Sequence, residues 1–391
     1  MQILGAGFVA FEATKSIYSL AFMFIAYSLP QLLGSYFVEP VLRRFGAKKV
    51  AAFSDFIRGI LLIALALAVL VDYKVLLLTY LLTFTASTLD AFYQPASNIL
   101  FQQILAGNLE ISRKKSSQLE LLTQIAMLLS VTGGALLVDL TGIYFVFFLN
   151  AATFLVAGVM IWIIHIIPQY SKDEEVRAPL ALYRSTLISH TDLVLNFSLG
   201  KIIPSVVNTL IIYFIIGHLA ASFSTLGLID AVAILGIGIG VWSVRFVDEK
   251  RNQQAMKICM YTSATFLAFA GYAGLEILIA TFFVSTIFFG LSRVLARVNI
   301  IEHISDNEAA AVYSTANVVG IFISILLTFF TCIVADFFGI AFGFFTLAAF
   351  FAAATLFIIM RQKKSQRENL KTGELRYEQL YKTNNTRRPN K

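Results

Sequence analysis

The sequence predicts an all-α integral membrane protein built from two similar halves. Hydrophobic residues make up 58% of its 391 residues, charged residues make up only 14%, and the mean hydropathy is +0.79. A soluble globular domain has a far more polar composition. Apolar stretches of about 20 residues, long enough to cross a bilayer as helices, recur from end to end. They leave no room for a separate soluble domain.

Eleven apolar stretches are long enough to be complete spans. They lie at residues 17–42, 50–71, 75–104, 118–139, 143–167, 193–216, 224–244, 255–275, 277–300, 309–335 and 340–360. Residues 1–11 are also apolar but cover about half of the length that a span requires. They lack the basic leader and the cleavage site of a signal peptide. We therefore expect a partial first helix.

Basic residues alternate between the two sets of loops, which predicts the orientation. One set carries Arg43, Arg44, Lys48, Lys49, residues 113–115, Lys172, Arg177, Arg184, Arg245, Lys250, Arg251 and the start of the tail at 361–364. The other set carries Glu12, Asp72, Asp139, His218, Glu276 and Asp336, with Lys15 and Lys74 as its cations. By the positive-inside rule the basic side is cytoplasmic, so the formal charge of +7 reflects loops rather than nucleic-acid binding.

An internal repeat relates the two halves. Residues 139–154 align without a gap on residues 336–351, beginning with the same Asp–Gly–Ile spacing and continuing through matched Phe and Ala positions. The basic loop after 17–42 has its counterpart after 224–244. The chain therefore reads as two parallel repeats with six helices each.

This repeat gives the domain organisation. We expect an N-terminal bundle at 1–167, a central cytoplasmic loop at 168–192, a C-terminal bundle at 193–360, and a disordered cytoplasmic tail at 361–391. The counterpart of the helix at 193–216 would begin before the first residue. Three explanations stay open: a start codon placed too late, a truncated gene product, or a first helix that enters the membrane as a half-helix.

Seven motifs resemble the major facilitator superfamily, and within it the macrolide-efflux-like drug:proton antiporters, which include enterobactin and other siderophore exporters. The matching residues are 29–33, 44–50, 54–58, 91–96, 133–134, 148–154 and 304–306. The resemblance implies two parallel six-helix bundles that rock about a midplane site. It also implies that the first, fourth, seventh and tenth helices line a central cavity.

Four positions depart from the pattern that the resemblance implies. Arg43 stands where the family has an acid before the loop motif Arg-Phe-Gly, and Ala86 stands where many relatives have an arginine used in proton coupling. Ala309 and Ala311 replace arginines that follow the tenth helix. The gate and the coupling mechanism are therefore expected to differ from those of the relatives.

A polar stripe on the fourth helix (75–104) is the first candidate for the substrate and proton pathway. Spacings of four and three residues put its members on one helical face: Thr83, Ser87, Asp90, Gln94 and Ser97. Charges inside a span are costly and count as functional candidates. The Asp90 carboxylate can bind a cationic compound or carry the exchanged proton, whereas the alternative is a hydrated Asp satisfied by neighbouring hydroxyls.

Similar stripes occur on the seventh (193–216) and tenth (277–300) helices. The seventh presents Ser198, Lys201, Ser205 and Asn208 beside the kink-forming Pro204. Lys201 can pair with Asp90, balance an anionic substrate, or snorkel to the cytoplasmic surface. The tenth helix carries Ser285, Ser292, Asn299, Arg293 and Arg297, and its two arginines are assigned to the gate or to lipid headgroups.

The remaining gating candidates lie around the third helix. Asp55 and Arg58, three residues apart, are expected to form a local ion pair that braces the inner gate. Arg44, Gly46 and Lys48 belong to the loop before it.

Other chemistry is not indicated. Residues 236–240 carry alternating glycines inside a span, which favours close helix packing over a nucleotide loop. His165, His190, His218 and His303 are scattered, and Cys259 and Cys332 lie in apolar stretches, so no metal site or cofactor is expected. Asp230 is assigned to the outer interface and Glu39 to the inner end of its helix.

The sequence thus predicts a plasma-membrane transporter rather than an enzyme. The expected function is proton-coupled efflux of an amphipathic, drug-like or cationic small molecule by a monomer. Its partners would be that substrate, protons and the lipid bilayer, without nucleic acid. The alternatives are another cargo, such as a siderophore or a lysolipid, and a truncated relative that does not transport.

Overall fold

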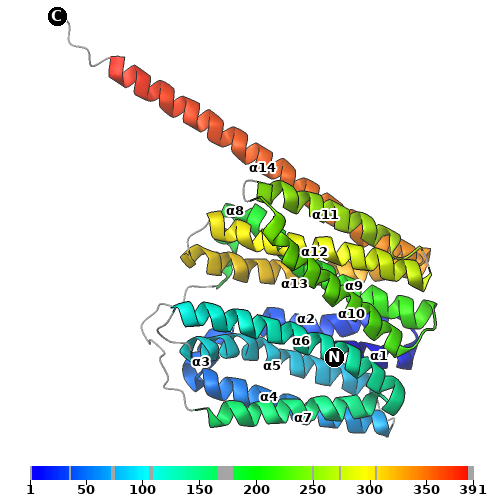
Figure 1. The fold of residues 1–391 in the computed structure, drawn as a ribbon. Helices are drawn as coiled ribbons and strands as arrows, with labels where there is room; N and C mark the ends of the chain where they lie inside the picture. Colours follow the sequence, from blue (N-terminus) through cyan, green and yellow to red (C-terminus); the bar gives the residue numbers. More distant parts are fainter. Residues whose placement is uncertain are drawn as a thin grey trace, which may run out of the picture.

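The computed structural model describes residues 2–34, 37–71, 75–104, 109–164, 179–248, 251–272, 274–303 and 306–385. Within these residues every regular element is a helix, so the prediction of an all-α fold is confirmed. Figure 1 shows two bundles, one formed by α1 to α7 and the other by α8 to α14, with the end of α14 projecting beyond the second.

The first bundle follows the expected order of helices. It contains α1 (Gln2–Thr14), α2 (Ile17–Gly34), α3 (Val38–Phe45), α4 (Ala47–Leu70), α5 (Val75–Ile104), α6 (Leu109–Thr141) and α7 (Ile143–Ile163). The predicted span at 17–42 is divided between α2 and α3. The first helix, α1, has 13 residues, too few to cross a bilayer.

The second bundle repeats this arrangement. It contains α8 (Pro179–Ser189), α9 (Thr191–Ile212) with the π-helical turn η1 (Tyr213–His218), α10 (Phe223–Ser243) with the 3₁₀ turn η2 (Val244–Phe246), α11 (Asn252–Phe269), α12 (Leu275–His303), α13 (Asp306–Phe338) and α14 (Ile340–Asn385).

Nine helices in the described parts of the chain are long and apolar enough to cross a membrane, which fits a multi-pass membrane protein. Two of the eleven predicted spans are shorter or more polar than the others. In α6 the apolar part is limited to Ile125–Thr141, and α11 begins with the polar residues Asn252, Gln253 and Gln254. α6 packs against α7 of its own bundle and against α10 of the other bundle, and α11 packs against α12 and α14.

Two predictions about the polar segments need correction. Residues 361–385, expected to be a disordered tail, continue α14 as a helix. The segment is rich in Lys, Arg, Glu, Gln and Leu, which have high helix propensity, and it follows an apolar helix that supplies the nucleus. The predicted central loop contains α8; residues 165–178 and 386–391 lie outside the described part.

Two glycines at matched places support the internal repeat. Gly142 separates α6 from α7 and Gly339 separates α13 from α14, and both have positive φ angles, of 90° and 96°. Only glycine adopts this conformation without strain. The aligned Asp–Gly–Ile motif therefore encodes the same reversal of direction in both halves.

Glycines also bring α10 and α12 into close contact, as the spacing at 236–240 predicts. A Cβ atom on Gly240 would lie 2.8 Å from the backbone nitrogen of Leu291 and even closer to the carbonyl oxygen of Ile287. A Cβ atom on Gly290 would lie 2.6 Å from the carbonyl oxygen of Ile237. Gly238, on the opposite face of α10, has nothing within 4 Å. Small residues thus set the distance between the two helices.

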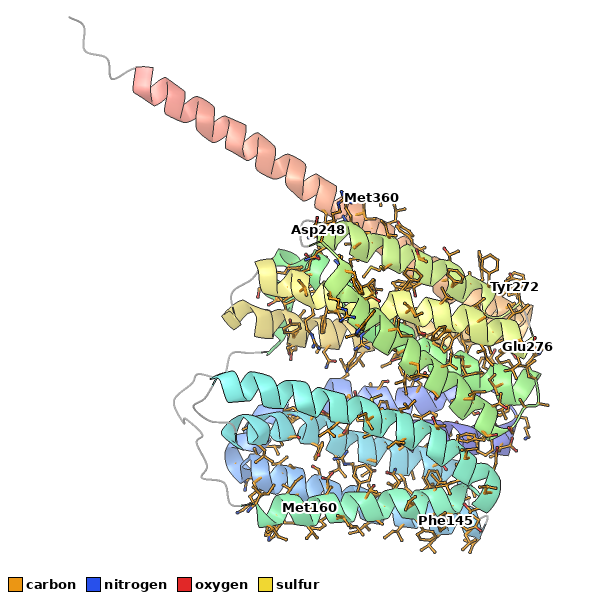
Figure 2. All side chains as sticks on the ribbon, viewed as in Figure 1. Phe145, Met160, Asp248, Tyr272, Glu276 and Met360 are labelled. Atoms are coloured by element: carbon orange, nitrogen blue, oxygen red, sulfur yellow. The ribbon has the colours of Figure 1, made fainter. Side chains whose placement is uncertain are left out.

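The two bundles meet at one end, which we call the joined end. It contains the turns between α6 and α7 and between α13 and α14; Figure 2 shows Phe145, Tyr272 and Glu276 there, with Met160 and Asp248 toward the opposite end. Phe8 packs edge to face against Phe223, with ring centroids 4.8 Å apart. The rings of Phe11 and Tyr213 also meet across the bundles, at 5.9 Å.

Two aspartates at matched positions of the repeat form hydrogen bonds between the halves at the joined end. Asp139, near the end of α6, accepts a hydrogen bond of 2.9 Å from the backbone N–H of Ser224 in the first turn of α10. Asp336, near the end of α13, accepts one of 2.9 Å from the hydroxyl of Tyr18 in the first turn of α2. Each half therefore contributes one aspartate that accepts a hydrogen bond from the other half. The two aspartates occupy the same position in the internal repeat.

We predict that Gly240→Ala destabilises the protein by about 1–3 kcal/mol, because its Cβ overlaps the backbone of α12. Gly238→Ala is the matched control on the same helix and is expected to be neutral or slightly stabilising. Thermal unfolding of the purified variants in detergent measures the difference. Equal melting temperatures for the two variants would contradict the packing model.

We predict that Asp139→Ala combined with Asp336→Ala opens the joined end, because alanine removes both acceptors and each exposed hydrogen bond contributes about 0.5–1.5 kcal/mol. Spin labels at the exposed positions Val71 and Tyr272, one on each half, should report a second, longer distance in the double variant. Glu276→Gln neutralises an exposed acid at the same end and serves as the control. An unchanged distance distribution in the double variant would remove the aspartates from this role.

Candidate functional site

A cavity of about 470 Å³ lies between the two bundles. Its wall from the first bundle includes Tyr27, Arg58, Ser87 and Asp90, and its wall from the second includes Asn208, Asp230 and Ser285. The remaining lining is mainly aliphatic and aromatic. A volume of this size suits a drug-sized molecule.

The helices that line the cavity agree only partly with the expectation. The fourth, seventh and tenth helices of the predicted order, α5, α9 and α12, contribute as the resemblance implies. Among the described residues α1 contributes none, whereas α2, α4, α6, α7, α10 and α11 each contribute at least one. The short α1 instead packs at the joined end through Phe8 and Phe11.

An arginine between two carboxylates dominates the first wall. The guanidinium of Arg58 on α4 donates to Asp55 at 2.6 Å and to Asp90 of α5 at 3.0 Å. Arg58 and Asp55 are 5% and 1% exposed, so the surrounding protein screens their charges little. The pair predicted from the spacing of Asp55 and Arg58 is thus present, and Asp90 extends it into a trio.

Aromatic rings surround the same guanidinium. Its central carbon lies 4.2 Å from the ring centroid of Tyr93 and 4.7 Å from that of Phe154. Such stacking favours a desolvated arginine. Arg58 and Asp90 therefore line the cavity, with Arg58 near the middle of α4, and the role of Asp55 and Arg58 in an inner gate stays a prediction.

Only part of the predicted polar stripe on α5 lines the cavity. Ser87 and Asp90 line the cavity, and the Ser87 hydroxyl donates to the carbonyl oxygen of Tyr27 on α2. Thr83 is buried, and its hydroxyl has no hydrogen-bond partner among the described residues. Gln94 is exposed and does not line the cavity.

One of the polar residues predicted on α9 lines the cavity. Asn208 lines it and is exposed, although it lies in the middle of a span. The Ser205 hydroxyl donates to the carbonyl oxygen of Lys201 at 2.8 Å, within its own helix. Lys201 is exposed, and in the described part of the chain it makes no ion pair with Asp90.

On α12 the predicted serines are both buried but have different neighbours. Ser285 lines the cavity and bonds to Ser263 of α11, with 3.1 Å between the hydroxyl oxygens. Ser292 donates to the carbonyl oxygen of Phe289 at 2.8 Å and does not reach the cavity. Arg293 and Arg297 are exposed, and Arg293 lies against Gly200 of α9.

The other gating candidates lie at the opposite end from the joined end. Arg44 is exposed and lies 5.4 Å from the ring of Phe45, and Lys48 lies 6.0 Å from the ring of Trp162. Gly46 has a φ of 79°, which lets the chain turn from α3 into α4. Their role in gating stays a prediction.

Tyr27 and Asp230 also line the cavity, although neither was predicted to do so from the sequence. Asp230 reaches it from α10. The signal that identifies it is the face it shares with Ala233, Ile234 and Ile237, three, four and seven residues further on, all of which line the cavity. Hydropathy alone gives depth along a helix but not the direction of a side chain.

No group of three His, Cys, Asp or Glu side chains that could hold a metal ion occurs in the part of the chain that the structure describes. Cys259 and Cys332 are buried free thiols.

Comparisons with known proteins identify relatives of this fold. The family model described as Major Facilitator Superfamily matches residues 3–324. The crystal structure of the nucleoside transporter NupG is similar with a TM-score of 0.66 and 13% identity, covering 92% of this chain and 96% of that chain. The inward-open xylose transporter XylE from E. coli has a TM-score of 0.61 and 14% identity, covering 91% and 94%. None of the curated proteins compared with the chain matches it.

We predict that Arg58→Gln destabilises the protein by about 3–5 kcal/mol, because it leaves Asp55 buried without its cation. The double variant Asp55→Asn/Arg58→Gln should recover much of this loss, and Arg44→Gln, at an exposed position, should change little. Thermal unfolding of all three variants tests this coupling. A double variant that is less stable than Arg58→Gln alone would show that the ion pair is not the source of the stability.

Proposed function

The chain belongs to the Major Facilitator Superfamily, and on this premise we propose that it exports an amphipathic, cationic small molecule across the plasma membrane in exchange for protons. Membership of the family and the similar transporters identify a transporter rather than an enzyme. Cargo, direction and coupling are the parts that we propose.

The observation that carries the proposal is the Asp55–Arg58–Asp90 trio in the wall of a cavity between two halves. The halves touch at the joined end, which the positive-inside rule assigns to the outside. A rocking motion about the cavity would then expose it to one side of the membrane at a time. Parallel repeats of six helices are built for this motion.

Proton coupling follows from the charges of the trio. Arg58 pairs with two carboxylates, so protonation of either one leaves the guanidinium with a partner. Asp90 faces the cavity and is the more exposed of the two, at 21% of its side chain. A proton can therefore enter and leave at Asp90, while Asp55 keeps Arg58 neutralised. Arg58 also supplies a guanidinium to the cavity that Ala86 lines, where the macrolide-efflux-like relatives carry their arginine.

The remainder of the lining supports an amphipathic cargo. Ile203, Val207, Ile234, Leu267 and Phe282 form apolar surfaces on the second wall. They would bury a hydrophobic body, whereas a few polar groups orient it. Two carboxylates, Asp90 and Asp230, and one arginine line the cavity, so its formal charge favours a cation.

A neutral polar cargo is the competing proposal, because the structures similar to this chain include a nucleoside transporter and a xylose transporter. Ser87, Asn208 and Ser285 could hydrogen-bond to hydroxyl groups of such a molecule. The apolar surfaces and the unequal number of carboxylates favour the amphipathic cation.

The test is efflux of a fluorescent lipophilic cation, and of a macrolide, from cells that lack their own pumps and express this chain. Efflux that a protonophore abolishes supports the proposal. Proton-coupled uptake of nucleosides or sugars without cation efflux would overturn the proposed cargo. Good expression with transport of neither class would favour a relative that does not transport.

We predict that Asp90→Asn abolishes protonophore-sensitive efflux while expression and membrane insertion are unchanged. The amide cannot exchange a proton, but it preserves the size of the side chain and can still accept from Arg58. Asp90→Glu keeps the carboxyl group and should retain part of the activity. Glu12→Gln, at an exposed acid outside the cavity, is the control. Wild-type efflux with Asp90→Asn would remove Asp90 from proton coupling.

A further inference from the structure

Asp230 places a second carboxylate in the cavity, on the half opposite to the trio. It lies in the third turn of α10, within the span Phe223–Phe246, and is partly buried. The same face of the helix presents Ala233, Ile234 and Ile237 to the cavity. Asp230 is therefore a single acidic group on an otherwise apolar strip of the second wall.

Asp230 and Asp90 differ in what already neutralises them. Arg58 lies 3.0 Å from a carboxylate oxygen of Asp90. In the described residues, by contrast, no hydrogen bond or ion pair reaches the side chain of Asp230. A charge inside a membrane span is costly unless a partner or water compensates it, so such a group is a candidate for a function. Asp90 thus has a cationic partner in the protein, whereas Asp230 has none among the described side chains.

The surroundings of Asp230 define the chemistry of that cation. Ile234 and Ile237 flank the carboxylate on its own helix, and Phe282 and Phe289 of α12 line the same cavity. The packing of α10 against α12 through Gly236, Gly240 and Gly290 fixes this wall as a rigid unit. A small hydrated metal ion would find no other acidic ligand on this wall. An organic cation with apolar substituents would satisfy both the carboxylate and its neighbours.

We infer that Asp230 is the binding site for the positive charge of the cargo, separate from the trio that exchanges protons. This inference rests on the proposed function and deepens it. A residue on α10 of the second half binds the positive charge of the cargo, whereas residues on α4 and α5 of the first half carry out proton coupling. Cargo and proton then need not compete for one carboxylate. The binding of cargo and the binding of protons would then be coupled through the shared cavity and the motion of the halves.

The test is equilibrium binding to the purified full-length chain in detergent. Tetraphenylphosphonium is the probe, and tetraphenylborate, which has nearly the same size and the opposite charge, is its matched control. We expect the wild type to prefer the cation and Asp230→Asn to weaken cation binding by about 10-fold or more, since a charge-assisted interaction is lost. Asp230→Glu should restore most of the affinity. Asp90→Asn should change it less, because Arg58 already neutralises Asp90.

The outcomes separate the two proposals. If the wild type binds the cation and Asp230→Asn binds it equally well, the inference about Asp230 is overturned while the cationic cargo stands. If the wild type shows no preference for the cation over tetraphenylborate, the cationic cargo itself is overturned, and the inference falls with it. Glu276→Gln controls for general loss of negative charge.

A measurement on the wild type keeps the inference testable if Asp230→Asn does not fold. A hydrophobic carbodiimide reacts with carboxyl groups inside membrane spans, and mass spectrometry locates the modified residue. Tetraphenylphosphonium should protect Asp230 from this modification in a concentration-dependent manner, and tetraphenylborate should not. Modification of Asp230 that the cation leaves unchanged would contradict a role in binding it.

Discussion

The burial of Arg58 is the constraint on which the first half of this transporter depends. A guanidinium in the middle of a bilayer-spanning bundle requires compensation, and Asp55 and Asp90 supply it from α4 and α5. Tyr93 and Phe154 cover its faces and keep water away. One arginine therefore fixes the relative position of two helices and at the same time orients the acid that faces the cavity. Under the proposed function, the same group would serve both structure and transport.

Close packing at glycines shapes the second half, as it also does at Gly34 and Gly59 in the first half. Gly236, Gly240 and Gly290 bring the backbones of α10 and α12 together, which leaves no room for a side chain between them. In a bilayer this packing replaces the hydrophobic effect as the source of helix association. The wall that carries Asp230 is consequently rigid. The cavity thus combines a wall held by an ion-pair network with a wall held by glycine contacts.

In the proposed alternating-access cycle the interface between the halves opens, so it must be weaker than the packing within either half. At the joined end the halves share a buried apolar cluster, which includes Ile17, Leu20 and Ala135 of the first half. They also share aromatic pairs and two exposed hydrogen bonds, from Ser224 to Asp139 and from Tyr18 to Asp336. Each exposed hydrogen bond contributes only about 0.5–1.5 kcal/mol. The repeat makes the two hydrogen bonds equivalent, so a rocking motion strains both in the same way.

The sequence by itself determined the membrane-spanning all-α fold, the two repeated halves, the glycine contact at α10 and the local pair of Asp55 with Arg58. Each follows from composition, from periodicity or from a spacing within one helix. Only the tertiary structure decided that Arg58 reaches Asp90 on another helix, that Lys201 stays unpaired with it, and that Asp230 faces the cavity. These depend on the rotation of each helix about its own axis. In a chain so uniformly apolar, that rotation is set by packing against neighbours that lie far away in the sequence.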